Sequence, residues 1–369
     1  MRMVKANRGS FSSRIRIIWA IAAKDVLDAL KNRTTLGVIL SVVFLIVFYR
    51  VLPGLESGNL LPRLALYDAG SSRIISDLDD SSELDLFEMA SLEDVEWYVG
   101  DRELVVLGLV LPADFDRQVE AGESIELEGY VAHWASDAAV AEVREFFESE
   151  LGELAGQPVH ISVEGNVVHT RPDSRGMAFA QSIMMVFALF ITGVTVTPHL
   201  MLEERQTRTL EALLVAPVSS GQLVIGKALA GLFYCLIATG VTFAFNTALI
   251  TQWGMASLAA VCGSLFAVSL GLLLGSIIQS RQQLSFWAWV TMLPLILAVV
   301  LVLMSDILPD WAVKALQWVP TAALAEIFRA SFSDQSGLAR FGPQMALILG
   351  WTVPLLVAVV WIVRRTDRR

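Results

Sequence analysis

Residues 258–278 read LAAVCGSLFAVSLGLLLGSII, an apolar run without a charged side chain. A run of this length suits a helix that crosses the roughly 30 Å hydrocarbon core of a bilayer, because a helix satisfies its own backbone polar groups. Ala267, Gly271 and Gly275 recur within it at four-residue spacing, which lets a second helix approach closely. The stretch therefore predicts a membrane-spanning helix, and packing inside a single helical bundle accounts for its small residues.

Five further apolar runs also have the length of a membrane span. They cover residues 35–52, 178–202, 224–250, 284–304 and 344–363. The composition agrees, because a chain of 369 residues that is 55% hydrophobic and 17% charged is too apolar for a soluble domain. We therefore expect an α-helical polytopic membrane protein with six transmembrane helices, residues 35–52 forming the first and residues 177–369 containing the other five.

The segment before the first span, residues 1–34, is a basic leader. It lacks a small-residue cleavage site, so the first span is expected to be a retained signal anchor rather than a removed signal peptide. The helical period of the leader separates an apolar face from charged side chains. The apolar set is Ile15, Ile18, Trp19, Ala22, Val26 and Leu30, and the charged set is Arg16, Lys24, Asp25 and Lys31. This pattern predicts an amphipathic helix on the inner membrane surface, with Arg16, Trp19 and Lys24 as interfacial residues.

Lysine and arginine gather on one side of the predicted spans. With an even number of crossings, that side holds the leader, the connection between the second and third spans, Arg281 and the C-terminus, with sixteen basic and only six acidic residues. Cytoplasmic loops carry the excess of Lys and Arg, so both termini are expected in the cytoplasm of a multi-pass protein of the cell membrane. The acidic residues behind the net charge of −10 then lie mostly outside, and such a charge gives no reason to expect a nucleic-acid partner.

The polar segment 53–176 is long enough to fold as a domain of its own. Its patterns predict strands over 63–68, 104–111, 125–134 and 159–168, with helices over 114–120 and 138–154. We expect an inserted extracytoplasmic α/β domain. It shows no arrangement of nucleophile and base, so an enzyme is disfavoured, whereas substrate gating, partner docking and dimer contacts all stay open.

A second external segment, residues 305–343, contains Trp311 and Trp318 and a helical period over 319–332. Tryptophans concentrate at membrane interfaces, so this segment predicts a helix that lies at the outer interface or dips partly into it. A gating role and a plain connecting loop with an interfacial helix are equally good interpretations of this segment.

The spans contain almost no ionisable residues. Arg50 and Lys227 stand near span ends, where their side chains are expected to reach the interface. A proton-driven transporter needs charged relays within its spans, so that class is disfavoured and the energy source is expected in a separate subunit.

Residues 221–228, GQLVIGKA, match part of a phosphate-binding loop, but Ala228 replaces the Ser or Thr that would hold Mg²⁺, and the segment continues into a predicted membrane helix. Cys235 and Cys262 lie in apolar runs and are expected to be buried hydrophobic residues. The four histidines show no metal-ligand spacing. No catalytic residue, bound cofactor or metal is therefore expected in this chain.

The connection between the second and third spans, residues 201–230, reads MLEERQTRTLEALLVAPVSSGQLVIGKALA. It combines an acidic and basic cluster, a T-L-E-x-L-L segment, a proline followed by a polar pair, and a G-K at the start of the next helix. This pattern resembles the permeases of ABC transporters of the type-two exporter class. The matching residues are Glu203, Glu204, Arg205, Thr209, Leu210, Glu211, Leu213, Leu214, Pro217, Gly226 and Lys227. The stretch 206–208 departs from the pattern, which has a glycine before the threonine.

The resemblance extends over most of the chain. It includes the leader, one span, a large external α/β domain, five more spans with a late external helix, and the stretch 105–122, VVLGLVLPADFDRQVEAG, in which a strand ends at a proline before a short helix. It implies a permease subunit of an ATP-driven exporter. Its partners would be two copies of a cytosolic ABC ATPase, which bind ATP and Mg²⁺, a second permease copy or a homologue, and membrane lipid.

Within this resemblance, residues 203–223 are expected to couple the permease to the ATPase. Thr209 can cap a short helix. The leucines of that helix would form an apolar face that fits a groove on the ATPase. Arg205 and Glu211 would then make polar contacts at the rim.

Two other functions compete with the exporter. A membrane-anchored sensor or scaffold would use the external domain to bind a ligand or partner, but it needs only one or two crossings. An ATP-independent channel would need a ring of pore-lining charges, which the sequence does not show. The transported substrate, the identity of the ATPase and the choice between homodimer and heterodimer stay open.

Overall fold

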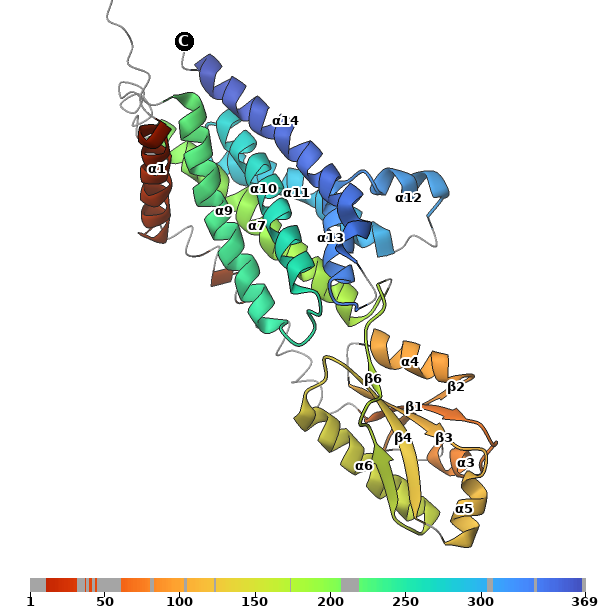
Figure 1. The fold of residues 1–369 in the computed structure, drawn as a ribbon. Helices are drawn as coiled ribbons and strands as arrows, with labels where there is room; N and C mark the ends of the chain where they lie inside the picture. The colour runs from red at the N-terminus through yellow and green to blue at the C-terminus, as the bar shows by residue number, and fades with distance from the viewer. Residues whose placement is uncertain are drawn as a thin grey trace, which may run out of the picture.

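The computed structural model describes residues 11–31, 37, 40, 41, 44, 61–79, 83–102, 105–122, 124–172, 174–206, 219–303, 308–334 and 337–366. Within them, a helical bundle and a small α/β domain are stacked end to end (Figure 1). Five of the described helices are long and apolar enough to cross a membrane. These are α7 (Met177–Gln206), α9 (Ser220–Phe245), α10 (Trp253–Ile277), α11 (Arg281–Leu303) and α14 (Gly342–Thr366). They confirm five of the predicted spans, whereas the predicted first span, 35–52, lies outside the described residues except for four isolated positions.

Helices α7 and α10 pack through the predicted stripe of small residues. A Cβ atom added to Gly271 would lie 2.2 Å from the carbonyl oxygen of Gly193, and one added to Gly275 would lie 2.6 Å from that of Pro198. Both distances are shorter than atoms can approach, so only glycine fits at these two contacts. The stripe therefore serves packing inside the bundle, as predicted.

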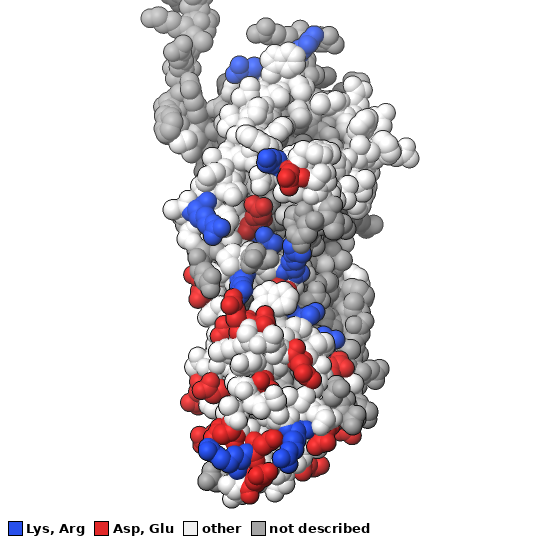
Figure 2. Space-filling view, turned by 90° about the vertical axis from the view of Figure 1, so that its right-hand side faces the viewer, with Lys and Arg blue, Asp and Glu red and all other residues white. Residues whose placement is uncertain are grey.

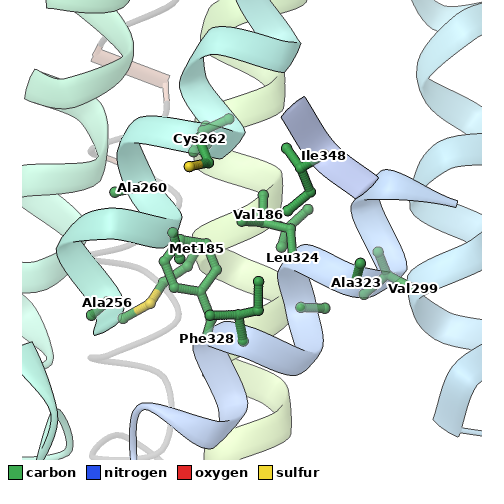
Figure 3. Packing of buried hydrophobic residues seen from close by; sticks show 14 of the residues in the cluster. Met185, Val186, Ala256, Ala260, Cys262, Val299, Ala323, Leu324, Phe328 and Ile348 are labelled. Carbon is green, nitrogen blue, oxygen red and sulfur yellow. The ribbon is translucent and has the colours of Figure 1, made fainter. Parts of the chain in front are cut away.

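The segment after α11 forms α12 (Asp310–Leu316), α13 (Pro320–Ala330) and a 3₁₀ turn, η3 (Leu338–Phe341). Trp311 and Trp318 are 73% and 71% exposed, as expected for an interfacial segment. In helix α13, Leu324 and Phe328 are buried in one cluster with residues of α7, α10, α11 and α14 (Figure 3). The sequence predicted a helix that lies at the outer interface or dips partly into it, and the structure adds that neighbouring helices of the bundle enclose α13.

The α/β domain is built on one mixed sheet with strand order β2-β1-β3-β4-β5. Strand β1 is parallel to β2 and β3, β4 is antiparallel to β3 and parallel to β5, and β6 pairs with β4. The strands are β1 (Arg63–Asp68), β2 (Asp85–Met89), β3 (Val106–Leu111), β4 (Ile125–Ala132), β5 (Val159–Ser162) and β6 (Val167–Val168), and the helices are α3 (Ile74–Asp79), α4 (Leu92–Asp101), α5 (Phe115–Ala121) and α6 (Asp137–Ala155).

The two faces of this sheet are covered by different helices. Alternate residues of β1 point to opposite faces, so Leu64 packs into a cluster with Phe147 of α6, while Ala65 packs with Val95 of α4. Helix α4 lies between the sheet and the bundle (Figure 1). The predicted elements are confirmed with small shifts, except that the strand predicted over 159–168 is two strands separated by a turn, and that α3, β2 and α4 were not predicted.

Helix α1 (Phe11–Lys31) and the C-terminal end of α14 lie at the end of the bundle opposite the α/β domain (Figure 1). Figure 2 shows acidic side chains gathered over the α/β domain, whereas the bundle presents few charges on the same face. A largely uncharged band between two charged ends is the surface that a membrane-spanning bundle needs.

Candidate functional site

The predicted coupling segment is only partly described. Glu203, Glu204 and Arg205 belong to the last turns of α7. The other candidate residues, which are Thr209, Leu210, Glu211, Leu213, Leu214 and Pro217, lie outside the described residues. The contact of this segment with an ATPase therefore stays a prediction.

The two helices that flank this segment meet at the end of the bundle opposite the α/β domain. Met201, near the end of α7, and Leu223, in the first turn of α9, share one buried cluster. Helix α9 starts with a capping box, in which the Ser219 backbone N–H donates to Gln222 Oε1 over 2.9 Å and the Gln222 N–H donates to Ser219 Oγ over 3.3 Å. The stretch 221–228 is thus helical from its first residue and does not form a phosphate-binding loop.

Lys227 of α9 is fully buried. Its Nζ lies 3.1 Å from Asp25 Oδ2 of α1 and donates a second hydrogen bond of 2.7 Å to the Leu200 carbonyl of α7. The prediction that Lys227 reaches the membrane interface is wrong, and so is the placement of Asp25 off the buried face of the leader. Each of these two charged side chains can be buried because the opposite charge of the other compensates it. The sequence pattern of a single helix cannot reveal such an ion pair between two helices.

Two further contacts hold α1 against α9. A Cβ atom added to Gly226 would lie 2.7 Å from Ile21 Cγ2, so glycine at this position lets the two helices touch. The hydroxyl of the buried Tyr234 donates to the Val26 carbonyl over 2.5 Å. We refer to Ile21, Asp25, Gly226, Lys227 and Tyr234 as the α1–α9 clasp.

The interfacial candidates of the leader lie on the exposed side of α1. Trp19 is 65% exposed, and Arg16 and Lys24 are also exposed. The buried side is formed by Ile21 and Ala22 together with Asp25. The face away from the bundle therefore combines an aromatic and basic side chains, the composition that membrane headgroups attract.

A second set of contacts joins the α/β domain to the bundle at the opposite end. Nε2 of His133, just after β4, donates to the Leu249 carbonyl in the α9–α10 connection over 3.3 Å. Trp134 packs against buried clusters of both the domain and the bundle. Asp101 Oδ1 accepts from the backbone N–H groups of Arg175 and Gly176, just before α7, over 2.8 and 3.2 Å. We call this region the junction.

Acidification is expected to weaken the junction through His133. Burial lowers the pKa of His133 below its ordinary value, against the opposing effects of the Leu249 hydrogen bond and Asp334. Nδ1 is buried without a hydrogen bond among the described residues, and the ring stacks on that of His169 at a centroid distance of 4.9 Å, so protonation would place a charge in a desolvated site. Because the unfolded chain then binds more protons than the folded protein, stability falls as the pH drops below about 6.5, and this penalty is absent at higher pH.

Thermal unfolding in detergent between about pH 8 and about pH 5.5 measures this effect. His133→Gln keeps an N–H for the Leu249 carbonyl but does not titrate, so the variant should lose less stability on acidification than the wild type. Equal losses in the two proteins would show that another group is responsible.

The described residues contain no group of three or more His, Cys, Asp and Glu side chains placed to hold a metal ion. Cys235 and Cys262 are buried free cysteines, as predicted. The main features of the described residues are two sets of contacts between elements. The α1–α9 clasp holds α1 against one end of the bundle, and the junction joins the α/β domain to the other end.

Comparison of the sequence with known proteins identifies a family and two relatives. The sequence model of the ABC-2 family transporter proteins matches residues 33–363. Two curated proteins from two strains of Escherichia coli, each named "Probable multidrug ABC transporter permease YbhR", are 24% identical over 323 residues, which cover 82% of this chain and 85% of each relative. The family match covers the α/β domain and the five long apolar helices.

Proposed function

The chain belongs to the ABC-2 family of transporter proteins, and from this premise we propose that it is the permease subunit of an ATP-driven exporter that works with a separate cytosolic ATPase. Permease subunits of ABC transporters are not themselves enzymes. In this proposal the chain forms half of a substrate pathway, completed by a second copy or a homologous permease. Two ATPase copies bind ATP and Mg²⁺.

The proposed topology has six spans, with the first over residues 35–52 and both termini in the cytoplasm. The α/β domain then lies outside the cell membrane and the α1–α9 clasp at its inner surface. Two observations support this orientation. The acidic surface of the domain lies at the end of the bundle opposite α1 (Figures 1 and 2), and the predicted cytoplasmic segments hold sixteen basic residues against six acidic ones.

The observation that carries the coupling proposal is the α1–α9 clasp. Lys227 contacts both α1 and the end of α7, so three helices meet at one buried charge directly beside the predicted coupling segment, 203–223. A push on that segment by an ATPase would reach all three helices together, because packed helices move as rigid elements. Because the curated relatives are named as probable multidrug permeases, we also propose that the substrates of this chain include drugs.

Replacing Leu210 and Leu213 with Asp is expected to abolish ATP-dependent transport and to leave membrane insertion intact. Two carboxylates would be buried without partners in the proposed apolar contact with the ATPase. The measurement is ATP-driven uptake of a panel of fluorescent drugs by inside-out vesicles that contain the permease and its ATPase.

The matched control is Leu210→Met with Leu213→Met, which keeps the contact apolar and should retain transport. Normal transport by the Asp variant would remove the coupling proposal. Membranes in which the wild type shows no ATP-driven transport of any kind, although the protein is inserted, would favour the sensor or scaffold.

A further inference from the structure

A pocket of about 300 Å³ opens at the junction. Its wall comes from α4, β4, the β5–β6 turn and the segment that leads into α7, and Asp334 completes it from the chain that follows α13. The pocket is therefore lined mainly by the α/β domain and the segment before α7, and the chain after α13 contributes Asp334. Its volume is at the lower end of the range for sites that bind small organic molecules.

Negative charge dominates the pocket. Three carboxylates line it, Glu96, Asp101 and Asp334, against one guanidinium, that of Arg171. The Arg171 charge is balanced separately, because its Nη2 lies 3.2 Å from Oε1 of Glu93, which is not a lining residue.

The hydrogen bonds of the Asp101 carboxylate do not remove its charge. Its Oδ1 accepts from the Ser174 hydroxyl and from two backbone N–H groups, all of which are neutral donors. Among the described residues, the structure shows no ion pair for Glu96 or Asp334. The pocket thus holds uncompensated negative charge in a partly enclosed space, which favours a cationic occupant.

Aromatic side chains supply the rest of the recognition surface. Trp97 lines the pocket and is 47% exposed, although it is large and apolar. Tyr130 lines it from the sheet, and burial together with the charges of Glu128 and Glu96 raises the pKa of its phenol. Faces of Trp and Tyr attract organic cations within about 6 Å of the ring centre.

The arrangement does not suit a metal ion. No three acidic or histidine side chains among the described residues come close enough to share one ion. The carboxylates instead stand around a space that is larger than an ion. Thr170 lies in the sequence between the lining residues His169 and Arg171. Its side chain is 1% exposed, and its hydroxyl has no hydrogen-bond partner in the described part of the chain.

We propose that this pocket binds a small organic cation, an ammonium group attached to a compact aromatic or aliphatic body. The ammonium group faces Glu96 and Asp334, and the body stacks on Trp97. Since Asp334 follows α13 of the bundle whereas Glu96 and Trp97 belong to the α/β domain, the bound cation ties the domain to the bundle. This site is distinct from the coupling segment, so its occupancy does not depend on the exporter proposal.

Isothermal titration calorimetry of the full-length protein in a non-ionic detergent tests the proposal. The probes are benzyltrimethylammonium, benzenesulfonate as an anion of similar size, and 2-phenylethanol as a neutral compound. Benzyltrimethylammonium should bind with a dissociation constant that rises with salt, because salt screens the partly exposed carboxylates. The anion and the neutral compound should show no saturable heat.

Two variants locate the site. Glu96→Gln with Asp334→Asn should weaken binding of the cation by about tenfold or more, whereas Asp77→Asn with Glu120→Gln removes the same charge at exposed positions away from the pocket and should leave binding unchanged. Trp97→Leu should weaken binding by about threefold to thirtyfold, with Trp311→Leu on α12 as its control.

The proposal fails if the cation gives no saturable heat with the wild type, or if the anion binds as well as the cation. It also fails if Glu96→Gln with Asp334→Asn binds as tightly as the wild type. Thermal unfolding of each variant identifies any that does not fold, and in that case the comparison of the three probes on the wild type decides the outcome.

Discussion

Replacing Lys227 with Met is expected to lower the free energy of unfolding by about 3–5 kcal/mol. The substitution removes the group that compensates Asp25, whose side chain is only 7% exposed, and leaves a carboxylate buried between two helices. It also leaves the Leu200 carbonyl without the donor that Nζ supplies over 2.7 Å. Unfolding of the purified protein in mixed micelles of increasing SDS content measures the change.

The second substitution Asp25→Leu in the same protein should restore most of that loss, because an apolar pair replaces a buried ion pair at little cost. Lys314→Met on α12 is the matched control, since this lysine is exposed and its loss should change stability by less than about 0.5 kcal/mol. A Lys227→Met protein as stable as the control would show that the clasp does not hold a buried charge.

Gly271→Ala is expected to lower the free energy of unfolding by about 1–3 kcal/mol. The added Cβ would lie 2.2 Å from the Gly193 carbonyl oxygen, a backbone atom that cannot rotate away, so α7 and α10 must separate. The loss should appear in the same micelle titration and as a lower midpoint of thermal unfolding.

Gly240→Ala is the control for this prediction. Gly240 is also inside a membrane-spanning helix, but a Cβ atom there meets nothing within 4 Å. Alanine removes the conformational cost of a glycine in a helix, so this variant should gain about 0.5–1 kcal/mol. If both alanine variants shift stability in the same direction, close packing of α7 on α10 is not what glycine provides at position 271.

The sequence predicted those elements that are determined by the length of an apolar run or by the period of its hydrophobic residues. The spans 258–278 and 284–304 match α10 and α11 within a few residues, because long apolar runs have one stable conformation in lipid. The strand predicted over 63–68 matches β1 at both ends, and the α/β class of the domain is confirmed.

What the sequence missed depends on contacts between distant segments. Asp25 and Lys227 are 202 positions apart, so the pattern of either helix alone suggests a solvated charge. Helix α13 carries two charged residues, Glu326 and Arg329, within a largely apolar stretch, which is typical of a surface helix, yet four neighbouring helices enclose most of it. In both cases burial is decided by the partner rather than by the local sequence.

The junction was missed for a related reason. Helix α4, which provides Glu96, Trp97 and Asp101, has four acidic residues among its ten and alternates them with apolar side chains, so it gave no clear helical or strand signal. The N-cap Ser91, whose hydroxyl accepts from the Asp94 backbone N–H, was the signal that could have located it.

The most direct test of the central claim is to purify the tagged protein from its native membranes in mild detergent, to identify by mass spectrometry what accompanies it, and to assay ATP hydrolysis. We predict that an ATPase with phosphate-binding-loop motifs is recovered, that the preparation hydrolyses ATP, and that Leu210→Asp with Leu213→Asp removes both while the protein stays in the membrane. Recovery of a well-folded protein with no ATPase and no ATP hydrolysis would contradict the claim that this chain is the membrane half of an ATP-driven exporter.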